Sequence, residues 1–432
     1  MRANFGLCAW QLSSISEWRL QQSPSSQRFL RENRQLNDIG SPWEVFRVFS
    51  RLGLTSFGGP IAHIGYYREE IVVRRQWLDD STYTDLVALC QFLPGPASSQ
   101  VAVSLGLVRA GYLGALAAWI AFTLPSATLM TAFAFGANAL GGEIGSGVIH
   151  GLKLVAVAIV AQAVWGMARS LCPDRQRASI AAIAVLMMII GTSFAAQVST
   201  IVMGGIVGFW LCRTSAPSLA ASLGAPVSRR AGAISLAIFF GLLIALPALS
   251  RSSQSISLFN AFYRSGALVF GGGHVVLPLL SEAFVTTGWV SQDAFLSGYG
   301  AAQSMPGPLF TFAAYLGAIA NTSPNTWAGA AVGIIGIFLP GILLLFGTLP
   351  FWDVFRRRVS AQAVMRGINA AVVGLLGAAL YNPLWISSMK TSGDVAIALV
   401  GFVLLTVWRT PPFIVVALGA LGGVAMSAAV RL

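Results

Sequence analysis

The chain carries one glycine- and proline-rich pattern twice. The first copy begins with Phe57-Gly58-Gly59-Pro60, passes Trp77 and ends in Gln91-Phe92-Leu93-Pro94-Gly95-Pro96. The second begins with Phe270-Gly271-Gly272-Gly273, passes Trp289 and ends in Gln303-Ser304-Met305-Pro306-Gly307-Pro308. A pattern repeated at about half the chain length indicates two structural repeats, an arrangement common in membrane transporters.

The composition places both copies in a membrane. The chain has 432 residues, of which 56% are hydrophobic and only 10% are charged, whereas soluble proteins carry about 25% charged residues. Apolar runs at residues 178–211 and 231–249 reach the roughly 20 residues that a membrane-spanning helix needs. The sequence therefore predicts an all-α polytopic membrane protein.

The net charge of +12 does not indicate nucleic-acid binding. The arginines lie in short loops between apolar segments, as positive-inside residues do. The four cysteines and three histidines are scattered, with no spacing typical of a disulfide framework or a metal site. We therefore expect no metal, no cofactor and no nucleic-acid partner.

The loop charges predict that the two repeats have opposite orientations. Arg169, Arg175 and Arg177 follow the predicted helix at residues 148–168, whereas in the second copy the arginines at positions 356–358 precede the matching helix. Equivalent helices therefore point in opposite directions. An extra crossing at residues 231–249 supplies the odd helix that an inverted repeat requires.

These patterns divide the chain into four parts. We expect a polar cytoplasmic extension at residues 1–41, a first repeat at 42–212, a loop and linker helix at 213–255, and a second, inverted repeat at 256–432. Helices that are broken or re-enter at the glycine and proline turns are compatible with about 9 to 13 membrane segments.

The Pro-Gly-Pro turns are the leading candidates for a binding site. Prolines stop one helix, and the next helix then starts with free N–H groups and a partial positive charge. Ser98 and Ser99 follow the first turn, and Thr311 matches Ser99 after the second. Two such helix starts could hold a small tetrahedral oxyanion. The alternative is that each turn only kinks a spanning helix.

Other candidates share a position in the two copies or carry an ionisable group inside an apolar segment. The glycine pairs permit either close helix contact or approach of backbone to a ligand. Lys153, a cation inside an apolar segment, could line an ion path or extend its side chain to the membrane interface. Each histidine could carry a proton or be a hydrogen-bonded interior residue. The substrate-binding candidates are Gly58, Gly59, Gln91, Pro94, Gly95, Pro96, Ser98, Ser99, Gly271, Gly272, Gln303, Pro306, Gly307, Pro308 and Thr311. The candidates for an anion or proton pathway are His63, Lys153, His274 and Asn369.

Taken together, the paired motifs resemble the chromate ion transporter family, and the length resembles its long, two-domain members. The resemblance covers about residues 42–432. It implies a bacterial inner-membrane protein that exports chromate from the cytoplasm, powered by the proton gradient or the membrane potential. The second copy departs from the pattern at Gly273, which replaces Pro60, and around Phe310, where the serines are lost.

Other functions fit the same pattern to different degrees. Sulfate is a tetrahedral dianion of similar shape, so a sulfate transporter would use the same site. An anion channel is also compatible, because broken helices build selectivity filters. Hydrolysis of ATP is not expected, since no GxxxxGK[ST] loop is present, and no enzyme-like cluster lies in the apolar segments. The expected partners are chromate or sulfate, protons and the lipid bilayer, with a homodimer as an open alternative to a monomer.

Overall fold

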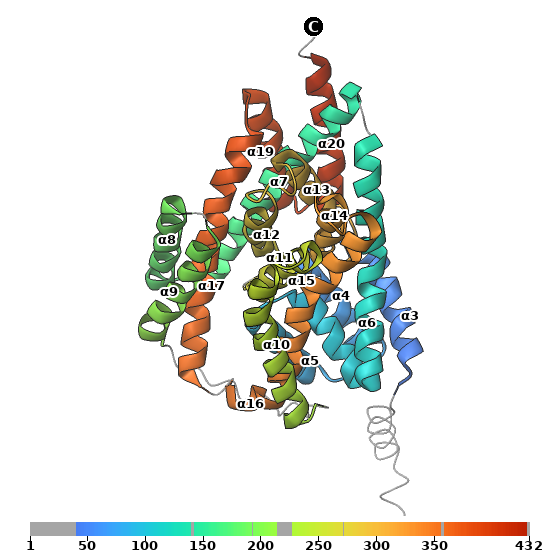
Figure 1. Ribbon diagram of the computed structural model, residues 1–432, viewed down its shortest axis with the longest axis vertical. Helices are drawn as coiled ribbons and strands as arrows, with labels where there is room; N and C mark the ends of the chain where they lie inside the picture. Colours follow the sequence, from blue (N-terminus) through green and yellow to red (C-terminus); the bar gives the residue numbers. More distant parts are fainter. Residues whose placement is uncertain are drawn as a thin grey trace, which may run out of the picture.

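Helices account for all the regular structure in the described part of the chain. The computed structural model describes residues 40–139, 142–191, 193–213, 227–270, 272–355 and 358–429, and these contain no strand. Six helical segments among them are long and apolar enough to cross a membrane. The predicted class, an all-α polytopic membrane protein, is confirmed (Figure 1).

The first repeat begins at a capped helix. Ser41 precedes Pro42, and its hydroxyl oxygen accepts a hydrogen bond from the Glu44 N–H at 3.2 Å, which satisfies one of the donors exposed at a helix start. The helices of this repeat are α3 (Pro42–Thr55), α4 (Gly59–Tyr67), α5 (Asp80–Phe92), α6 (Ala97–Ala139), α7 (Gly142–Leu171), α8 (Arg175–Ile190) and α9 (Phe194–Leu211), with a π-helical turn η1 (Arg68–Arg74) after α4. The apolar run at residues 178–211 is divided between α8 and α9.

The linker helix α10 (Arg229–Leu249) leads into the second repeat. The helices of this repeat are α11 (Gln254–Ala267), α12 (Val276–Phe284), α13 (Gln292–Ala302), α14 (Phe312–Ile319), α15 (Thr326–Thr348), α16 (Trp352–Phe355), α17 (Val359–Ala379), α18 (Ile386–Ser388), α19 (Ser392–Thr406) and α20 (Pro412–Ala429). Shorter turns interrupt it at η2 (Gly273–Val275), η3 (Leu309–Thr311), η4 (Leu349–Phe351) and η5 (Leu380–Trp385).

Helix α6 is a helical hairpin. Its backbone leaves the helical region at Ala110 and Gly111, where Gly111 has φ of +63°. Gly106 consequently lies directly against Gly114, only eight positions further along the chain. In the second repeat, Gly317 of α14 lies against Gly329 of α15 in the same way. Each repeat therefore contains one such hairpin, and glycine lets its two backbones touch.

Each repeat packs its last two helices on the other repeat. The α8–α9 hairpin packs on α17, where Gly204 and Gly208 lie against Gly367. The α19–α20 hairpin packs on α7, where Gly419 and Gly423 lie against Gly151. Gly151 and Gly367 occupy the same position in the two copies, so the exchange is reciprocal.

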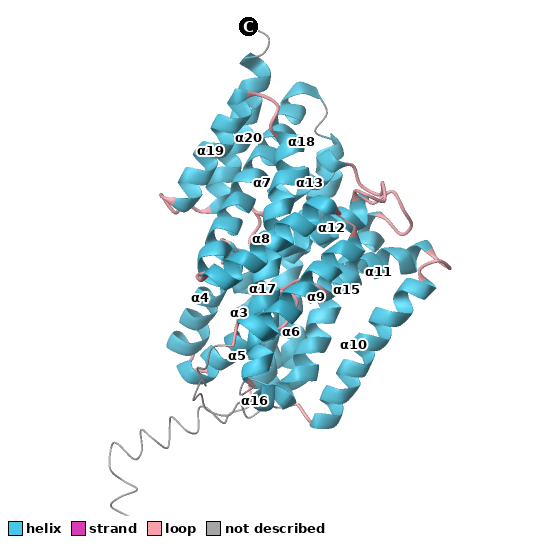
Figure 2. Cartoon of the chain, turned by 90° about the vertical axis from the view of Figure 1, so that its left-hand side faces the viewer, coloured by secondary structure: helices cyan, strands magenta, loops and turns pink. Residues whose placement is uncertain are grey.

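The exchange fits an inverted repeat. Figure 1 shows that α17 begins at the lower end of the molecule, near α16, whereas α7 begins at the upper end, near α20. In the side view of Figure 2, α10 runs along the outside of the bundle. It connects the lower end of the first repeat to the start of the second, as the predicted odd crossing must.

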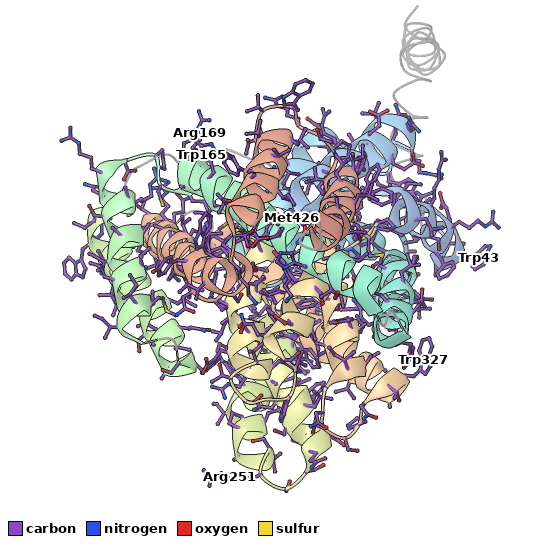
Figure 3. All side chains as sticks on the ribbon, turned by 90° about the horizontal axis from the view of Figure 1, so that it is seen from above. Trp43, Trp165, Arg169, Arg251, Trp327 and Met426 are labelled. Atoms are coloured by element: carbon purple, nitrogen blue, oxygen red, sulfur yellow. The ribbon has the colours of Figure 1, made fainter. Side chains whose placement is uncertain are left out.

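The outer surface suits a lipid environment. Trp43, Trp165 and Trp327 are all exposed, and Figure 3 shows them pointing outward around the rim of the bundle. Tryptophan is enriched where a membrane protein meets the interface between lipid and water. The interior core, by contrast, draws residues from both repeats, including Val157 of α7 and Tyr299 of α13.

Candidate functional site

The two glycine turns meet at the centre of the molecule. A Cβ atom on Gly273 would lie 3.4 Å from Pro60 Cγ, and these two residues occupy the same position in their copies. Contact between equivalent residues marks the axis that relates the repeats. Gly58, Gly59 and Gly272 have φ of +100°, +79° and +145°, which glycine adopts at little cost. Gly271 lies outside the described residues.

Each Pro-Gly-Pro turn is hydrogen-bonded to the glycine turn of the opposite repeat. The Gly95 N–H donates to the Val269 carbonyl oxygen at 2.7 Å, and the Gly307 N–H donates to the Ser56 carbonyl oxygen at 2.9 Å. Val269 and Ser56 each lie two residues before the first glycine of their motif. The four turns that the sequence singled out are therefore brought together in two reciprocal pairs.

The same two glycines also touch the long helices of the opposite repeat. A Cβ on Gly95 would lie 3.0 Å from Gly341 Cα, just after Pro340 of α15. A Cβ on Gly307 would lie 2.9 Å from the Ser126 hydroxyl oxygen, just after Pro125 of α6. Since both glycines also have positive φ, of +123° and +92°, no other residue fits these turns without strain.

Gln100 fixes the first Pro-Gly-Pro turn from within. Its side-chain Nε2 donates to the Pro94 carbonyl oxygen at 3.0 Å and to the Gly341 carbonyl oxygen at 2.9 Å. The residue is buried and so joins the turn of one repeat to the helix of the other. Gln100 is not among the site residues predicted from the sequence, although an amide one turn inside an apolar helix is a usable signal.

The hydroxyl groups after the two turns are not equivalent. Ser99 is 2% exposed, and its hydroxyl has no hydrogen-bond partner among the described residues. The Thr311 hydroxyl donates to the Pro308 carbonyl oxygen at 2.8 Å, inside the 3₁₀ turn η3 that opens the second helix. A buried hydroxyl without a partner is costly, so Ser99 is available to a ligand whereas Thr311 already bonds locally.

A group of unpaired buried polar atoms surrounds the first glycine turn. His63 Nε2 lies 3.2 Å from the Ser56 carbonyl oxygen, and its ring packs edge-on against Phe122 at 5.3 Å. Tyr67 packs against the same phenylalanine at 5.4 Å. The atoms left without a partner in this part of the described chain are Ser56 Oγ, His63 Nδ1, Tyr67 Oη and Thr123 Oγ1. Sequence reasoning found only His63, because isolated hydroxyl residues in apolar helices carry no repeat signal.

The remaining predicted residues lie in less uniform places. His274 Nδ1 lies 2.8 Å from the Tyr299 hydroxyl, so the two candidate histidines have different partners. Lys153 Nζ forms an ion pair with Asp293 at 2.6 Å, while its counterpart Asn369 is half-buried. Gln91 is exposed on α5 and Gln303 is half-buried. The structure thus brings together the turns, but not the paired glutamines.

The charged loop after α4 forms exposed ion pairs. Arg68 Nε lies 2.6 Å from Asp80 Oδ1, and Arg74 Nε lies 3.2 Å from Glu69 Oε1. Hydrogen bonds from the Thr82 hydroxyl and N–H hold the pKa of Asp79 below its usual range, which favours the ionised carboxylate that caps α5. This is the geometry of a solvated loop. No cluster of metal-ligating side chains occurs in the described ranges.

An inverted repeat of apolar helices, with two broken helices joined crosswise at its centre, defines a polytopic membrane transport protein. Comparison with known proteins gives the family: the family described as "Chromate transporter" matches residues 43–209 and 256–424. These ranges cover well over half of the sequence, and the chain belongs to the chromate transporter family.

Similar proteins of known name agree with this family. The chromate transport protein of Pseudomonas aeruginosa is 28% identical over 389 residues, which cover 88% of this chain and 90% of that protein. The chromate transport protein of Cupriavidus metallidurans is 27% identical over 343 residues, which cover 78% and 81% of the two chains. A probable chromate transport protein of Synechococcus elongatus is 26% identical over 398 residues, or 88% and 94%. No solved structure matches this chain.

Proposed function

We propose that this protein exports chromate from the bacterial cytoplasm across the inner membrane, driven by the proton gradient or the membrane potential. The observation that carries the proposal is the reciprocal pairing of the four turns, Gly95 with Val269 and Gly307 with Ser56. Because every turn of one repeat is bonded to the other repeat, a rocking motion of the repeats changes the geometry of all four at once. This is the coupling that alternating access requires.

The proposed chromate site lies at the first Pro-Gly-Pro turn. Ser99 supplies a buried hydroxyl with no other described partner, and the start of α6 adds partial positive charge. A dianion in this surround is held by hydrogen-bond donors, each charge-assisted bond contributing about 1.5–3 kcal/mol. The second turn acts mainly as a structural partner, since Thr311 is bonded to Pro308.

Two further features belong to the proposal. The side on which α3, α10 and α17 begin (Figure 1) is the cytoplasmic side, because Arg229, Arg230 and Arg358 lie there and positive residues favour that side; a cytoplasmic N-terminus is part of this proposal. His63, which has one unpaired ring nitrogen, and His274, which is paired with Tyr299, are two candidates for a proton-carrying group near the turns. Sulfate, which has the same shape and charge, is the alternative substrate for the same donors.

Transport into inverted membrane vesicles tests the function. We expect energised vesicles that contain the protein to accumulate radioactive chromate, and a protonophore to abolish the accumulation if protons are coupled. Excess sulfate should compete only if the site does not distinguish the two dianions. Chromate current that follows voltage linearly, without accumulation, would instead identify an anion channel and end the carrier proposal.

A further inference from the structure

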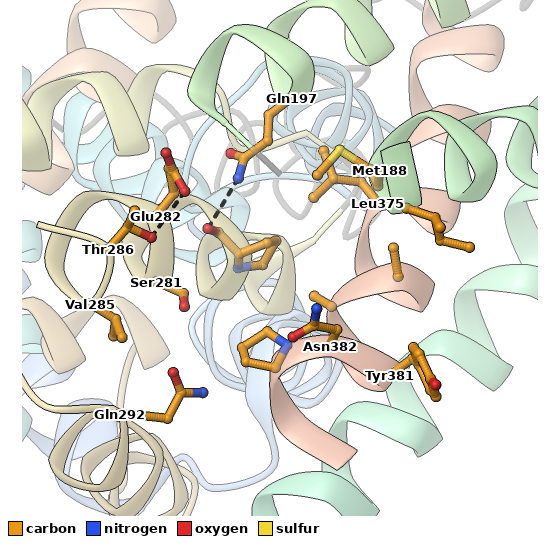
Figure 4. A pocket seen from close by; sticks show the side chains of 15 residues that line it. Met188, Gln197, Ser281, Glu282, Val285, Thr286, Gln292, Leu375, Tyr381 and Asn382 are labelled. Atoms are coloured by element: carbon orange, nitrogen blue, oxygen red, sulfur yellow. Dashed lines mark hydrogen bonds between the residues drawn. The ribbon is translucent and has the colours of Figure 1, made fainter. Parts of the chain in front are cut away.

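A cavity whose largely apolar wall carries several polar side chains lies apart from the four turns. It has a volume of about 290 Å³ and lies between the α8–α9 hairpin, α12 and the end of α17 (Figure 4). Both repeats contribute to its wall, the second also through Gln292 of α13 and the segment η5, and none of the described glycine-turn or Pro-Gly-Pro residues does. Its polar side chains are those of Gln197, Ser281, Glu282, Thr286, Gln292, Tyr381 and Asn382.

Glu282 gives the cavity its charge. No lysine, arginine or histidine is among the lining residues, and Glu282 forms no ion pair within the described chain. Its carboxylate accepts one hydrogen bond, from the Thr286 hydroxyl at 3.1 Å. Since a carboxylate offers about four lone-pair sites, most of its capacity to accept remains open. A half-buried carboxylate in this state attracts a cation and repels a dianion such as chromate.

The broken end of α17 adds to the negative potential. Ala378 and Ala379, in its last turn, line the cavity. At Asn382 the backbone leaves the helical region, with φ of −127° and ψ of 114°, and Pro383 has no N–H to donate. A helix C-terminus carries partial negative charge and unpaired carbonyl groups. In membrane transporters such ends, beside an unwound segment, coordinate sodium ions or protons.

A hydrogen bond between α9 and α12 holds another part of the cavity wall in place. Gln197 Nε2 donates to the Pro278 carbonyl oxygen at 3.3 Å and so joins α9 to α12. Figure 4 shows Gln197, Ser281 and Asn382 around one space, each from a different part of the chain. Side-chain oxygens of this kind are the ligands that hard cations prefer. The volume accommodates a small ion with several of its waters.

Positive groups near α12 are engaged elsewhere. The Arg264 guanidinium of α11 lies 3.5 Å above the Phe194 ring, and His274 of η2 pairs with the Tyr299 hydroxyl. Arg366, on α17, bonds to the Cys212 carbonyl oxygen. The Tyr263 hydroxyl of α11 donates to the Phe239 carbonyl oxygen at 3.0 Å. With these groups, the charged or titratable side chains on the elements that pack against α12 within the described chain are all accounted for; Arg213, just beyond the end of α9, lies on Phe209.

We propose that this cavity is a binding site for a monovalent cation, Na⁺ or a proton, with Glu282 as its anionic partner. The ion's role as the one coupled to transport rests on the proposed function, whereas its binding does not. The cavity is linked through α12 to the proposed chromate site at the first Pro-Gly-Pro turn. Helix α12 follows the second glycine turn, with only the short turn η2 between them. Occupancy of the cavity can thereby bias the arrangement of the turns.

Thermal unfolding of the purified full chain in detergent tests binding without any transport. We expect NaCl to raise the unfolding temperature relative to the same concentration of choline chloride, and Glu282→Gln to abolish this difference. Glu69→Gln is the matched control, because Glu69 lies in the exposed loop and pairs with Arg74; its sodium effect should equal that of the wild type. Asn382→Ala should raise the NaCl concentration that gives half of the stabilisation by roughly 3- to 30-fold, which is the loss expected for one or two ligand contacts.

A proton at the same site is distinguished by transport. If sodium has no effect, Glu282→Gln should still bind chromate but lose the pH dependence of uptake into inverted vesicles, with Glu69→Gln unchanged. Sodium stabilisation that survives Glu282→Gln would overturn the proposal. So would the absence of any sodium effect together with an unchanged pH profile. Chromate transport that fails in every variant and in the wild type would sink the proposed function while leaving the sodium-binding result intact.

Discussion

Lys153 Nζ, on α7 of the first repeat, lies 2.6 Å from Asp293 Oδ1, on α13 of the second. The lysine side chain is 9% exposed and the aspartate side chain is 67% exposed. The pair is therefore unequal: a largely buried cation depends on a carboxylate that is well solvated. Asn369 takes the place of Lys153 in the second copy, so no equivalent ion pair can form there.

We expect Asp293→Ala to destabilise the protein more than Lys153→Met. The first change leaves a buried ammonium without a counter-charge, which is costly, whereas the second removes the charge and keeps most of the apolar volume. The unfolding temperature in detergent gives the comparison, with Asp80→Ala as a control at the exposed start of α5, where Asp80 pairs with Arg68. A larger decrease in unfolding temperature for Lys153→Met than for Asp293→Ala would contradict this prediction. It would indicate that the lysine itself stabilises the protein.

Removing the Ser99 hydroxyl should weaken chromate binding. We expect Ser99→Ala to lower the apparent affinity by roughly 10- to 100-fold, since about 1.4 kcal/mol corresponds to a factor of ten. Thr311→Val should have a smaller effect, because that hydroxyl already donates to Pro308. Ser104→Ala is a matched control, as its hydroxyl donates to the Gln100 carbonyl oxygen. Radioactive chromate uptake at matched protein levels measures all three, and wild-type affinity in Ser99→Ala would remove the turn from the site.

A methyl group on Gly95 should be more damaging than the loss of either hydroxyl. The residue has φ of +123°, and a Cβ would lie 3.0 Å from Gly341 Cα. Backbone strain of this kind costs about 1–3 kcal/mol, and the displaced N–H weakens its bond to Val269. We expect Gly95→Ala to lose both thermal stability and transport. Gly136→Ala, where a Cβ meets nothing within 4 Å, should behave like the wild type; equal behaviour of the two variants would show that the turn tolerates rearrangement.

The two ends of α15 should face opposite compartments. Ser252 follows α10 near the start of α15, and Ser360 follows α16 beyond its end; both are exposed. In a background without native cysteines, we expect an impermeant maleimide added to intact cells to label Ser252→Cys and not Ser360→Cys. Inverted vesicles should give the opposite result. Labelling of both from the same side would defeat the proposed orientation.

The sequence by itself determined the class and the broad architecture. Apolar length, loop arginines and the repeated turns predicted a helical membrane protein with inverted repeats. The Pro-Gly-Pro turns also predicted where one helix stops and the next starts, as α5 and α6 do on either side of the first turn. These are local properties, because length, capping and glycine or proline content act within a few residues. The family resemblance followed from the same local motifs.

The tertiary structure decided which of these residues meet. Nothing in the spacing of the motifs shows that Gly95 bonds to Val269, since a contact between repeats depends on how two distant segments pack. The tertiary structure also decided that the Ser99 and Thr311 hydroxyl groups differ in their hydrogen bonding. A 3₁₀ turn in the second copy directs the Thr311 hydroxyl to the Pro308 carbonyl oxygen. The partner of Lys153 and the cavity around Glu282 likewise join several helices. Local pattern fixes where a helix begins and breaks, whereas a site between helices exists only once they are packed together.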